Sequence, residues 1–407
     1  MIEVNGKFNQ AIVYCDDIED EAIKQIRAVC DLYVFRERKI RVMPDCHLGK
    51  GCVIGFTAEL SEVIIPSLIG VDIGCGMYVV NLGPVELDFG ALDAHIRANI
   101  PSGNQIHDEV CTAVDEAFVE EVKRVSQLTN SDSIRHLKSL GTLGSGNHFI
   151  EVNQGVNNQR YLVVHSGSRN FGHQVAEHYM RKAAHYCERK KKKLKAARLQ
   201  AVKAAKKRDK TTIAQIEREY EALLMPYHVS GLMSFLEGGD REDYLRDMKV
   251  AQRYASMNRR LIAENVCRFL SLEIQNLETF ETVHNYIDFE DEIIRKGAVR
   301  AGLGEQLIIP INMRDGSILA IGKGNSEYNC SAPHGAGRML SRKTALETLS
   351  IEAYKESMSG IYTSSVNERT LDESPMAYKP MELILKNIEE TVDVVEIIRP
   401  LYNFKAD

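Results

Sequence analysis

The chain has 407 residues, of which 44% are hydrophobic and 27% charged, which is the composition of an ordinary globular protein with room for one large domain or two. No apolar run reaches the roughly 20 residues of a membrane span, and the nine cysteines lack the spacing of a disulfide framework, so neither a membrane protein nor a disulfide scaffold is expected. The net charge of −6 argues against a protein that binds nucleic acid nonspecifically over its whole surface.

The first part of the chain has the pattern of buried strands. The N-terminal sequence MIEVNGKFNQ lacks the basic start and apolar stretch of a signal peptide, so a cytoplasmic location is expected. Up to about residue 90, short β-branched runs alternate with glycine and proline, which predicts strands joined by tight loops. Residues 104–140 are predicted to be mainly helical, and the sequences HFIEV and YLVVHSGS return to the strand pattern.

A long helical segment follows, from about residue 173 to residue 257. Apolar residues recur every three or four positions and predict one apolar helix face, at Ile213, Ile216, Tyr220 and Leu223. Between Arg181 and Lys210 there are fourteen Lys or Arg residues and two acidic ones. A basic helix, a turn near residues 208–210 and an amphipathic helix back would form a protruding hairpin over residues 181–230. Such a run is ordinarily a solvated helix face, and contact with RNA is the alternative.

Strand signals resume after Ala298, in EQLIIPINM and SILAIGKG, and helices are predicted from there to the end. The chemically interesting sequences described next occur on both sides of the long helical segment. A domain boundary there would divide them, so we expect one α+β domain over residues 1–407, with buried mixed sheets flanked by helices and with residues 181–230 as a helical insertion.

Five short polar sequences stand in apolar, glycine-rich surroundings. They are MPDCHLGKG (residues 43–51), VDIGCGM (71–77), GSGNHFIE (144–151), VVHSGSR (163–169) and SAPHGAGR (331–338). Each carries Cys, His or Asp where an ordinary core strand would carry apolar residues. The pattern predicts one metal and phosphate site assembled from distant parts of the chain.

The candidate metal ligands are a carboxylate, a thiol and three imidazoles. Asp72 and Cys75 are separated by two residues, and the glycines beside them allow a tight turn. A buried structural cysteine next to a turn aspartate is the alternative at that pair. His148 and His165 lie at the ends of predicted strands, and His284 lies outside the five sequences. Together they suffice for one metal ion, or for two ions that share a bridging thiolate, and ligand softness alone favours Zn²⁺ or Fe²⁺.

The sequence SAPHGAGR predicts a phosphate-binding nucleophile. Neutral imidazole attacks phosphorus competently, and the small residues after His334 would let a phosphorylated ligand approach the backbone, at Gly335, Ala336 and Gly337. A tight turn before a helix near Met339 is the alternative interpretation. The loop PDCHLGKG brings Asp45, His47 and Lys50 together and lacks the spacing of a Walker loop. It is interpreted as a phosphate-binding or supporting loop.

Taken in order, these sequences resemble the RtcB family of RNA-splicing ligases, from about Lys39 to Lys405. The resemblance implies an enzyme that uses GTP and two Mn²⁺ ions to join RNA ending in a 2′,3′-cyclic phosphate or 3′-phosphate to RNA with a 5′-hydroxyl. It places the metal ligands at Asp72, Cys75, His148, His165 and His284, with Cys75 bridging the two ions. His334 would become the guanylylated residue, and Asp45 is assigned a catalytic role as well.

The resemblance also implies a GTP pocket. Its residues would be Asn147, His148, Phe149, Ile150, Glu151, His284, Asn285, Pro310, Ile311, Asn312, Met313, Ser317, His334, Gly335, Ala336, Gly337, Tyr378 and Lys405. Glu151 would accept hydrogen bonds from the guanine edge, and Lys405 would reach the base. The sequence does not show whether an activating protein takes part, and it does not indicate the oligomeric state.

The chain departs from the family pattern in two places. Residues 310–314 read PINMR where the family usually has PGSMG, and the basic run from Arg189 to Lys210 is longer than the family core requires. Two other classes of function compete with the ligase. One is a dinuclear metal-dependent phosphodiesterase that acts on RNA ends without joining them, and the other is an RNA-binding protein without catalysis.

Overall fold

The structure is a computed structural model that describes residues 1–15, 18–111, 114–205, 210–229 and 231–406. Helices and sheets are mixed, as expected for the α+β class. The helices are α1 (Asp20–Cys30), α2 (Phe89–Asn99), α3 (Glu116–Thr129), α4 (Ser133–Lys138), α5 (Arg169–Ala205), α6 (Lys210–Leu224), α7 (Gly238–Phe269), α8 (Arg342–Thr348), α9 (Ile351–Ser357) and α10 (Met381–Ile388). None of the helices in these ranges is long and apolar enough to cross a membrane.

A six-stranded mixed sheet contains the N-terminal strands. Its order is β1 (Ile2–Asn5), β2 (Gln10–Val13), β3 (Ile40–His47), β4 (Ile54–Glu59), β12 (Ile293–Lys296) and β11 (Asn285–Asp288). The pair β2 and β3 is parallel and the other pairs are antiparallel. Residues 2–59 and residues 285–296 therefore share one sheet, which agrees with a site built from distant segments.

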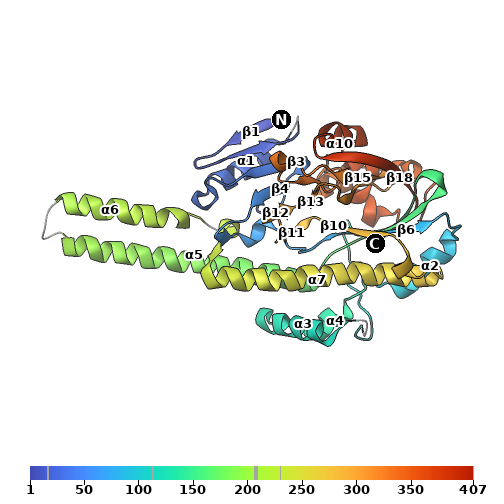
Figure 1. The fold of residues 1–407 in the computed structure, drawn as a ribbon, viewed down its shortest axis with the longest axis horizontal. Helices are drawn as coiled ribbons and strands as arrows, with labels where there is room; N and C mark the ends of the chain where they lie inside the picture. Colours follow the sequence, from blue (N-terminus) through green and yellow to red (C-terminus); the bar gives the residue numbers. More distant parts are fainter. Residues whose placement is uncertain (16–17, 112–113, 206–209, 230, 407) are drawn as a thin grey trace.

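The second sheet is larger and lies on the side of the body away from α6 (Figure 1). Its order is β10 (Thr279–Val283), β6 (Gly76–Gly83), β8 (Arg160–Ser166), β7 (Phe149–Gln154), β18 (Val392–Lys405), β15 (Gly316–Gly322) and β14 (Gln306–Asn312), and β17 (Tyr362–Thr363) pairs with β18. Two small sheets pair β13 (Ala298–Arg300) with β16 (Ser331–Pro333), and β5 (Val63–Ile64) with β9 (Leu236–Glu237).

The two faces of the large sheet have different roles. Side chains alternate along a strand, so one face of β7 carries Ile150 and Val152 while the other carries Phe149 and Glu151. Ile150 and Val152 pack in a buried cluster with residues of α2, α7, β8 and β18. α7 runs along this side of the body (Figure 1). The first face thus anchors the sheet, and the opposite face carries a smaller apolar cluster around Phe149 together with polar Glu151.

Most of the predicted elements are confirmed, with two differences. Residues 104–111 form a loop, and helix begins only at Glu116 in α3. The chain ends in β18 rather than in helices, because residues 392–405 pair with β7 and β15 on either side. The helical segment after residue 173 is α5, α6 and α7, and α5 and α6 lie side by side and project from the body (Figure 1). The turn predicted near residues 208–210 falls largely outside the described residues.

Candidate active site

A buried thiol and two buried imidazoles meet at one point of the large sheet. The Sγ atom of Cys75 lies 3.4 Å from Nε2 of His148 and 3.3 Å from Nε2 of His165. Ligand atoms of these three residues all lie within 4.8 Å of one another. A thiolate with two imidazoles is a donor set suited to a transition metal ion.

Strand ends bring this cluster together. β6 begins just after Cys75, β8 ends just after His165, and the sheet pairs Gly76 with both Ser166 and Val283. His284 follows Val283, and its ring centroid lies 5.1 Å from that of His165. Sequence neighbours of paired residues must lie at the same edge of the sheet, so Cys75, His165 and His284 converge.

Hydrogen bonds to the backbone orient the two clustered imidazoles. Nδ1 of His148 lies 2.9 Å from the carbonyl oxygen of Leu143, and Nδ1 of His165 lies 3.1 Å from that of Asn147. Each ring can donate its Nδ1 hydrogen to the carbonyl, so that in the neutral ring Nε2 is an acceptor directed at Cys75. The fixed tautomer makes both rings ready metal ligands.

Asp72 and His284 complete the predicted ligand set. Oδ2 of Asp72 lies 3.1 Å from Nε2 of His148, and the backbone N–H of Ser168 donates to Oδ1 of Asp72. Within the part of the chain that the structure describes, Nδ1 of buried His284 has no hydrogen-bond partner. A buried polar atom without a hydrogen-bond partner lowers the stability of the fold, so a ligand bound to this ring would remove that free-energy penalty. All five predicted metal ligands thus lie together.

Burial determines the protonation of this cluster. Burial raises the pKa of the Cys75 thiol well above its usual value, and the neighbouring Asp72 charge raises it further. Burial lowers the pKa values of His165 and His284 well below the usual value, so both rings are neutral. Burial opposes ionisation of Asp72, but hydrogen bonding and charge from His148 outweigh it and lower the pKa of Asp72 to about 2. The residues therefore fit a divalent cation, whose binding would displace the thiol proton.

His334 is held by a buried carboxylate. Oδ2 of Asp45 lies 2.6 Å from Nδ1 of His334 and accepts a second hydrogen bond from its backbone N–H. Asp45 is fully buried at the end of β3, whereas His334 is partly exposed. Gly337 has φ +74° and lies against the backbone of Asp45, where a Cβ would approach the carbonyl oxygen to 2.4 Å. The small residue is needed for β3 and the HGAGR loop to meet.

The positions of Asp45 and His334 favour attack by the imidazole. A carboxylate accepts a hydrogen bond from Nδ1–H, so Nε2 carries the lone pair. The ring of His334 also lies against His284, at a centroid separation of 4.8 Å. The candidate nucleophile is therefore adjacent to the candidate metal cluster.

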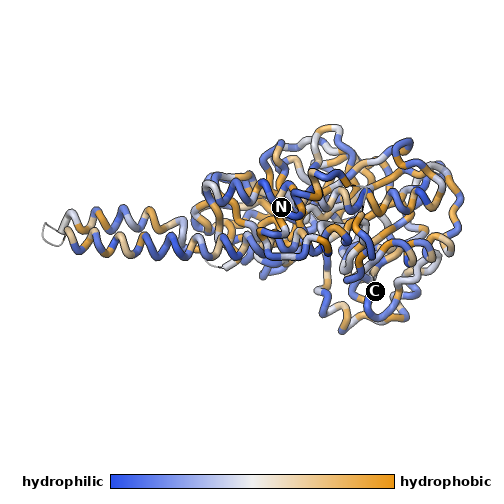
Figure 2. Tube along the Cα trace, turned by 90° about the horizontal axis from the view of Figure 1, so that it is seen from below, coloured by the Kyte–Doolittle hydropathy of each residue, from blue (hydrophilic) through white to orange (hydrophobic). Residues whose placement is uncertain are grey.

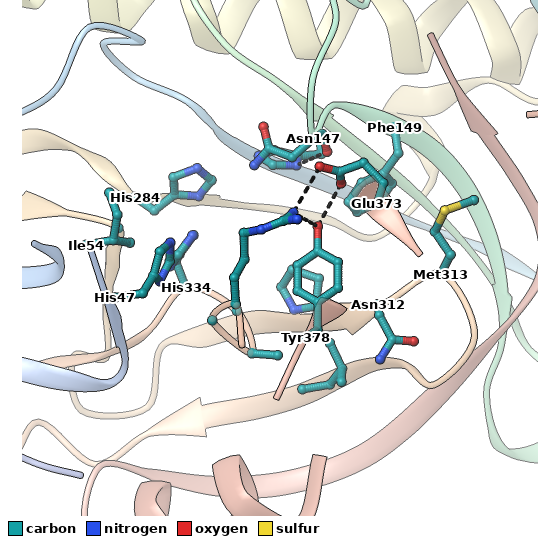
Figure 3. A pocket seen from close by; sticks show the side chains of 18 of the residues that line it. His47, Ile54, Asn147, Phe149, His284, Asn312, Met313, His334, Glu373 and Tyr378 are labelled. Atoms are coloured by element: carbon teal, nitrogen blue, oxygen red, sulfur yellow. Dashed lines mark hydrogen bonds and ion pairs between the residues drawn. The ribbon is translucent and has the colours of Figure 1, made fainter. Parts of the chain in front are cut away.

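A cavity of about 470 Å³ opens beside these groups. The predicted GTP-pocket residues that line it are Asn147, Phe149, Glu151, His284, Asn285, Pro310, Ile311, Asn312, Met313, Ser317, His334, Gly335, Ala336, Gly337, Tyr378 and Lys405. Figure 3 shows several of them facing one another across the cavity. His148 lies behind the lining in the metal cluster, and the side chain of Ile150 faces the apolar core on the far side of β7. Only the backbone of Ile150 is therefore available to a ligand.

One lining residue that the sequence reasoning missed is Glu373. Its buried carboxylate accepts from Nζ of Lys405 at 2.7 Å. It also accepts from the hydroxyl of Tyr378 at 2.7 Å (Figure 3). Arg342 and Arg338 approach the same carboxylate at 2.6 and 3.4 Å. Burial opposes ionisation, but the charges of Lys405 and Arg342 lower the pKa of Glu373 to about 2. Asp372 also pairs with Arg342, so two anions face three cations and this wall of the cavity remains positive, which suits a phosphorylated ligand.

The lining also contains Glu151, which pairs with Asn403 across β7 and β18. Nδ2 of Asn403 donates to Oε2 of Glu151 at 2.7 Å. Burial raises the pKa of Glu151 to about 7, although the neighbouring amides of Asn153 and Asn403 lower it. Among the described residues, Oδ1 of Asn403 and the hydroxyl of Ser317 have no hydrogen-bond partner. These free acceptors and donors line the cavity and are available to a bound base.

The segment that departs from the family pattern forms a turn of its own. Oδ1 of Asn312 accepts hydrogen bonds from the backbone N–H groups of Arg314 and Asp315. Arg314 makes two hydrogen bonds to Asp315, and the hydroxyl of Tyr354 contacts Sδ of Met313 at 3.1 Å. Arg314 is thereby turned towards Asp315, and Asn312 and Met313 remain in the cavity lining.

Two buried residues of α7 fix the loops of the site. Nη1 of Arg259 donates to the carbonyl oxygens of Gly74 and Ser166, which flank Cys75 and His165. Oδ1 of Asn258 accepts from the backbone N–H groups of Gly141 and Thr142. Both residues are completely buried. α7 therefore positions the loops of the metal cluster through hydrogen bonds of Asn258 and Arg259 with the loop backbone. The sequence did not reveal this role, because both residues lie within a helix.

Comparison with known proteins identifies the family. Residues 25–406 match the family model described as tRNA-splicing ligase RtcB. The chain is 29% identical to RNA-splicing ligase RtcB1 of Escherichia coli strain ATCC 25922, over 96% of this chain and 95% of that protein. It is 28% identical to tRNA-splicing ligase RtcB of Methanococcus maripaludis, over 90% of this chain and 87% of that protein. The match covers nearly the whole length and both sheets, and the chain belongs to the RtcB family.

Proposed function

We propose that the protein is an RNA ligase that joins RNA ending in a 2′,3′-cyclic phosphate or 3′-phosphate to RNA with a 5′-hydroxyl, with GTP as the energy source. Membership of a family described as tRNA-splicing ligase supports the ligase activity and a role in RNA repair or tRNA splicing. The observation that carries the chemical proposal is His334. Its Nδ1 is held by Asp45, and its ring lies between a cavity and a metal-ligand cluster.

The reaction begins at His334. Its Nε2 attacks the α-phosphorus of GTP, a bond from nitrogen to phosphorus forms, the bond to the β-phosphate oxygen breaks, and pyrophosphate leaves. Asp45 holds the ring and stabilises the positive charge that develops on it. Where the RNA end is a cyclic phosphate, water first attacks the phosphorus and breaks its bond to the 2′-oxygen, which leaves a 3′-phosphate. An oxygen of the 3′-phosphate then attacks the guanylyl phosphorus, the bond to Nε2 breaks, and RNA-(3′)pp(5′)G forms. Attack by the 5′-hydroxyl of the second RNA joins the strands and releases GMP.

The nucleotide would lie in the cavity, in contact with the polar groups of its lining. Ionised Glu151 would accept hydrogen bonds from the guanine edge, as Asn403 holds its carboxylate in place. Lys405 lies on the same strand as Asn403 and is within reach of the base. Arg338 and Arg342 would lie on the anionic side of the nucleotide. Specificity for GTP is supported by this set of acceptors.

Two Mn²⁺ ions are proposed at Asp72, Cys75, His148, His165 and His284, with Cys75 between them. When bound, these ions would neutralise charge on the reacting phosphates. Replacing Cys75 with Ala removes the only thiol of the cluster and should lower Mn²⁺ content to less than half of wild type, measured by elemental analysis after dialysis. Replacing Cys187, a buried cysteine on α5, is the matched control. Equal metal content in the two variants would contradict the proposed bridging thiolate.

The decisive experiment for the ligase mechanism is covalent labelling. Incubation with GTP and Mn²⁺ is expected to add one guanylyl group to the protein, detected by intact mass, and His334→Ala should abolish it. His185→Ala, on the exposed side of α5, should be labelled like wild type. Hydrolysis of cyclic phosphate by an unlabelled wild-type protein would instead support the dinuclear phosphodiesterase.

We further propose that residues 1–407 form one catalytic domain in which residues 181–230 are an insertion. Support comes from the site itself, because the six-stranded sheet supplies Asp45 and the eight-stranded sheet supplies Glu151 and Lys405. A boundary between the sheets would divide the cavity. We place the protein in the cytoplasm, where RNA with such ends arises.

A further inference from the structure

The helices α5 and α6 form an arm that takes no part in the cavity. We define the arm as residues 189–205 of α5 together with α6. Both views show it projecting from the body as two helices side by side (Figures 1 and 2). Half-buried and buried apolar residues form its seam, at Leu194, Ala197, Ala201, Ala205, Ile213, Ile216, Tyr220 and Leu224. An ion pair of 3.5 Å between Arg198 and Glu217 joins the two helices.

Positive charge is concentrated on the arm. Residues 189–205 contain eight Lys or Arg residues and no acidic residue, although the whole chain has a net charge of −6. α6 contains three glutamates, and one of them, Glu217, is engaged by Arg198. The remaining cations of α5 form few ion pairs. One of these is the exposed pair of Lys192 with Glu188, at 3.5 Å. Such an exposed ion pair is weak, so it offsets little of the positive charge of the arm.

Four exposed cations share one face of the helix. Arg189, Lys192 and Lys193 lie within about one turn of each other, and Lys203 lies on the same face further along the helix. Exposed Ala196, Leu199 and Gln200 occupy the stretch between them. The 17 residues from 189 to 205 extend about 25 Å at 1.5 Å per residue. The exposed cations therefore lie along one face of α5, and α5 itself packs against α6.

A helix that only has to remain soluble does not require this arrangement. Like charges three or four residues apart repel and destabilise a helix, and α5 contains several such pairs, such as Arg189 with Lys193 and Lys191 with Lys195. α6 mixes both signs of charge instead. Bound phosphates along the basic face of α5 would relieve the repulsion.

We propose that this face binds the phosphate backbone of a double-helical stem in the RNA substrate, away from the ends that are joined. The inference rests on the proposed RNA ligase function. Single-stranded RNA is usually held by stacking of its bases on aromatic side chains, and residues 189–205 contain no aromatic residue. A straight row of cations complements the fixed row of phosphates along a stem, and such contacts are independent of base sequence.

The test compares two triple variants that remove equal charge. The arm variant is Lys192→Gln, Lys193→Gln and Lys203→Gln, and glutamine has about the helix propensity of lysine. The control is Lys24→Gln, Lys123→Gln and Arg260→Gln, which are exposed on α1, α3 and α7. The RNA probes are a hairpin whose stem flanks the reactive ends and a short unstructured oligonucleotide with the same ends.

For the arm variant, the Kd for the stem RNA should rise about tenfold, and the slope of log K against log salt should fall by about 2 to 3. Binding of the short oligonucleotide and guanylylation by GTP should remain at wild-type levels, and the control should match wild type throughout. An unchanged Kd for the stem RNA, in a variant with wild-type helix content by circular dichroism, would overturn the inference. Equal weakening for both RNAs would overturn the assignment to a stem. Failure of wild-type guanylylation would reject the proposed function separately, since binding is measured without GTP.

Discussion

At the scale of single residues, the site depends on buried ionisable groups whose neighbours determine their charge. Asp45 is fully buried and accepts hydrogen bonds from His334, and Glu373 is buried among Lys405 and Arg342. Glu151 differs because its neighbours are mainly amides, and burial raises its pKa to about 7. Glu151 is therefore the acidic residue of the cavity that titrates near neutral pH.

The affinity for GTP should depend on the ionisation of Glu151. A protonated carboxyl group loses acceptors that guanine N–H groups need, so affinity should increase as the pH rises through about 7 and level off above it. Between pH 8 and pH 6 the Kd for GTP should rise about tenfold more for wild type than for Glu151→Gln, whose amide does not titrate. Calorimetry with both proteins at matched Mn²⁺ measures this difference. Parallel pH profiles would show that Glu151 does not carry the effect.

Site residues could be predicted from the sequence where ionisable side chains interrupt apolar segments. Site residues in ordinary polar segments could not. His165 and Cys75 were identifiable because ionisable residues interrupt apolar, glycine-rich strands. Glu373 and Asn403 gave no such signal. Glu373 is one acidic residue among several in its segment, and Asn403 becomes a site residue only because β18 pairs with β7. Their roles follow from long-range pairing, which local sequence patterns do not encode.

At the scale of elements, the ends of neighbouring strands gather the metal ligands. The strands themselves were predictable, because β-branched runs between glycines specify β6, β7 and β8. Their order was not, and the C-terminal strand β18 was predicted as helix. Its alternation is interrupted by a bulge near Pro400, and its stability comes from two partner strands distant in sequence.

α7 should be as important to the site as the strands that carry the ligands. Asn258→Ala would leave the backbone N–H groups of Gly141 and Thr142 without their buried acceptor, and should lower the free energy of unfolding by about 2–4 kcal/mol. Arg260→Ala, on the exposed side of the same helix, should change it by less than about 0.5 kcal/mol. Chemical denaturation measures both values. Equal stability of the two variants would mean that Asn258 is not a structural clamp.

At the scale of the whole molecule, the protein combines a body that contains the chemistry with an arm that contains the positive charge. The cavity is lined by residues of both sheets and of the C-terminal segment, and no residue of the arm lines it. The hydropathy pattern separates the parts as well, because apolar residues are packed throughout the body but form only a narrow seam in the arm (Figure 2). The two parts should therefore be separable by mutation.

Replacing residues 191–222 with a four-residue Gly/Ser linker tests this separation. The replacement keeps buried Leu224 and the ion pair of Lys190 with Glu237, at the base of the arm. Since no cavity residue is removed, the rate of guanylylation should stay within about twofold of wild type, and Tm should fall by no more than a few degrees. Intact mass over time and calorimetry measure the two quantities. A folded protein that has lost guanylylation would show that the arm supports the cavity, and the catalytic unit would then have to include α5 and α6 over their full length.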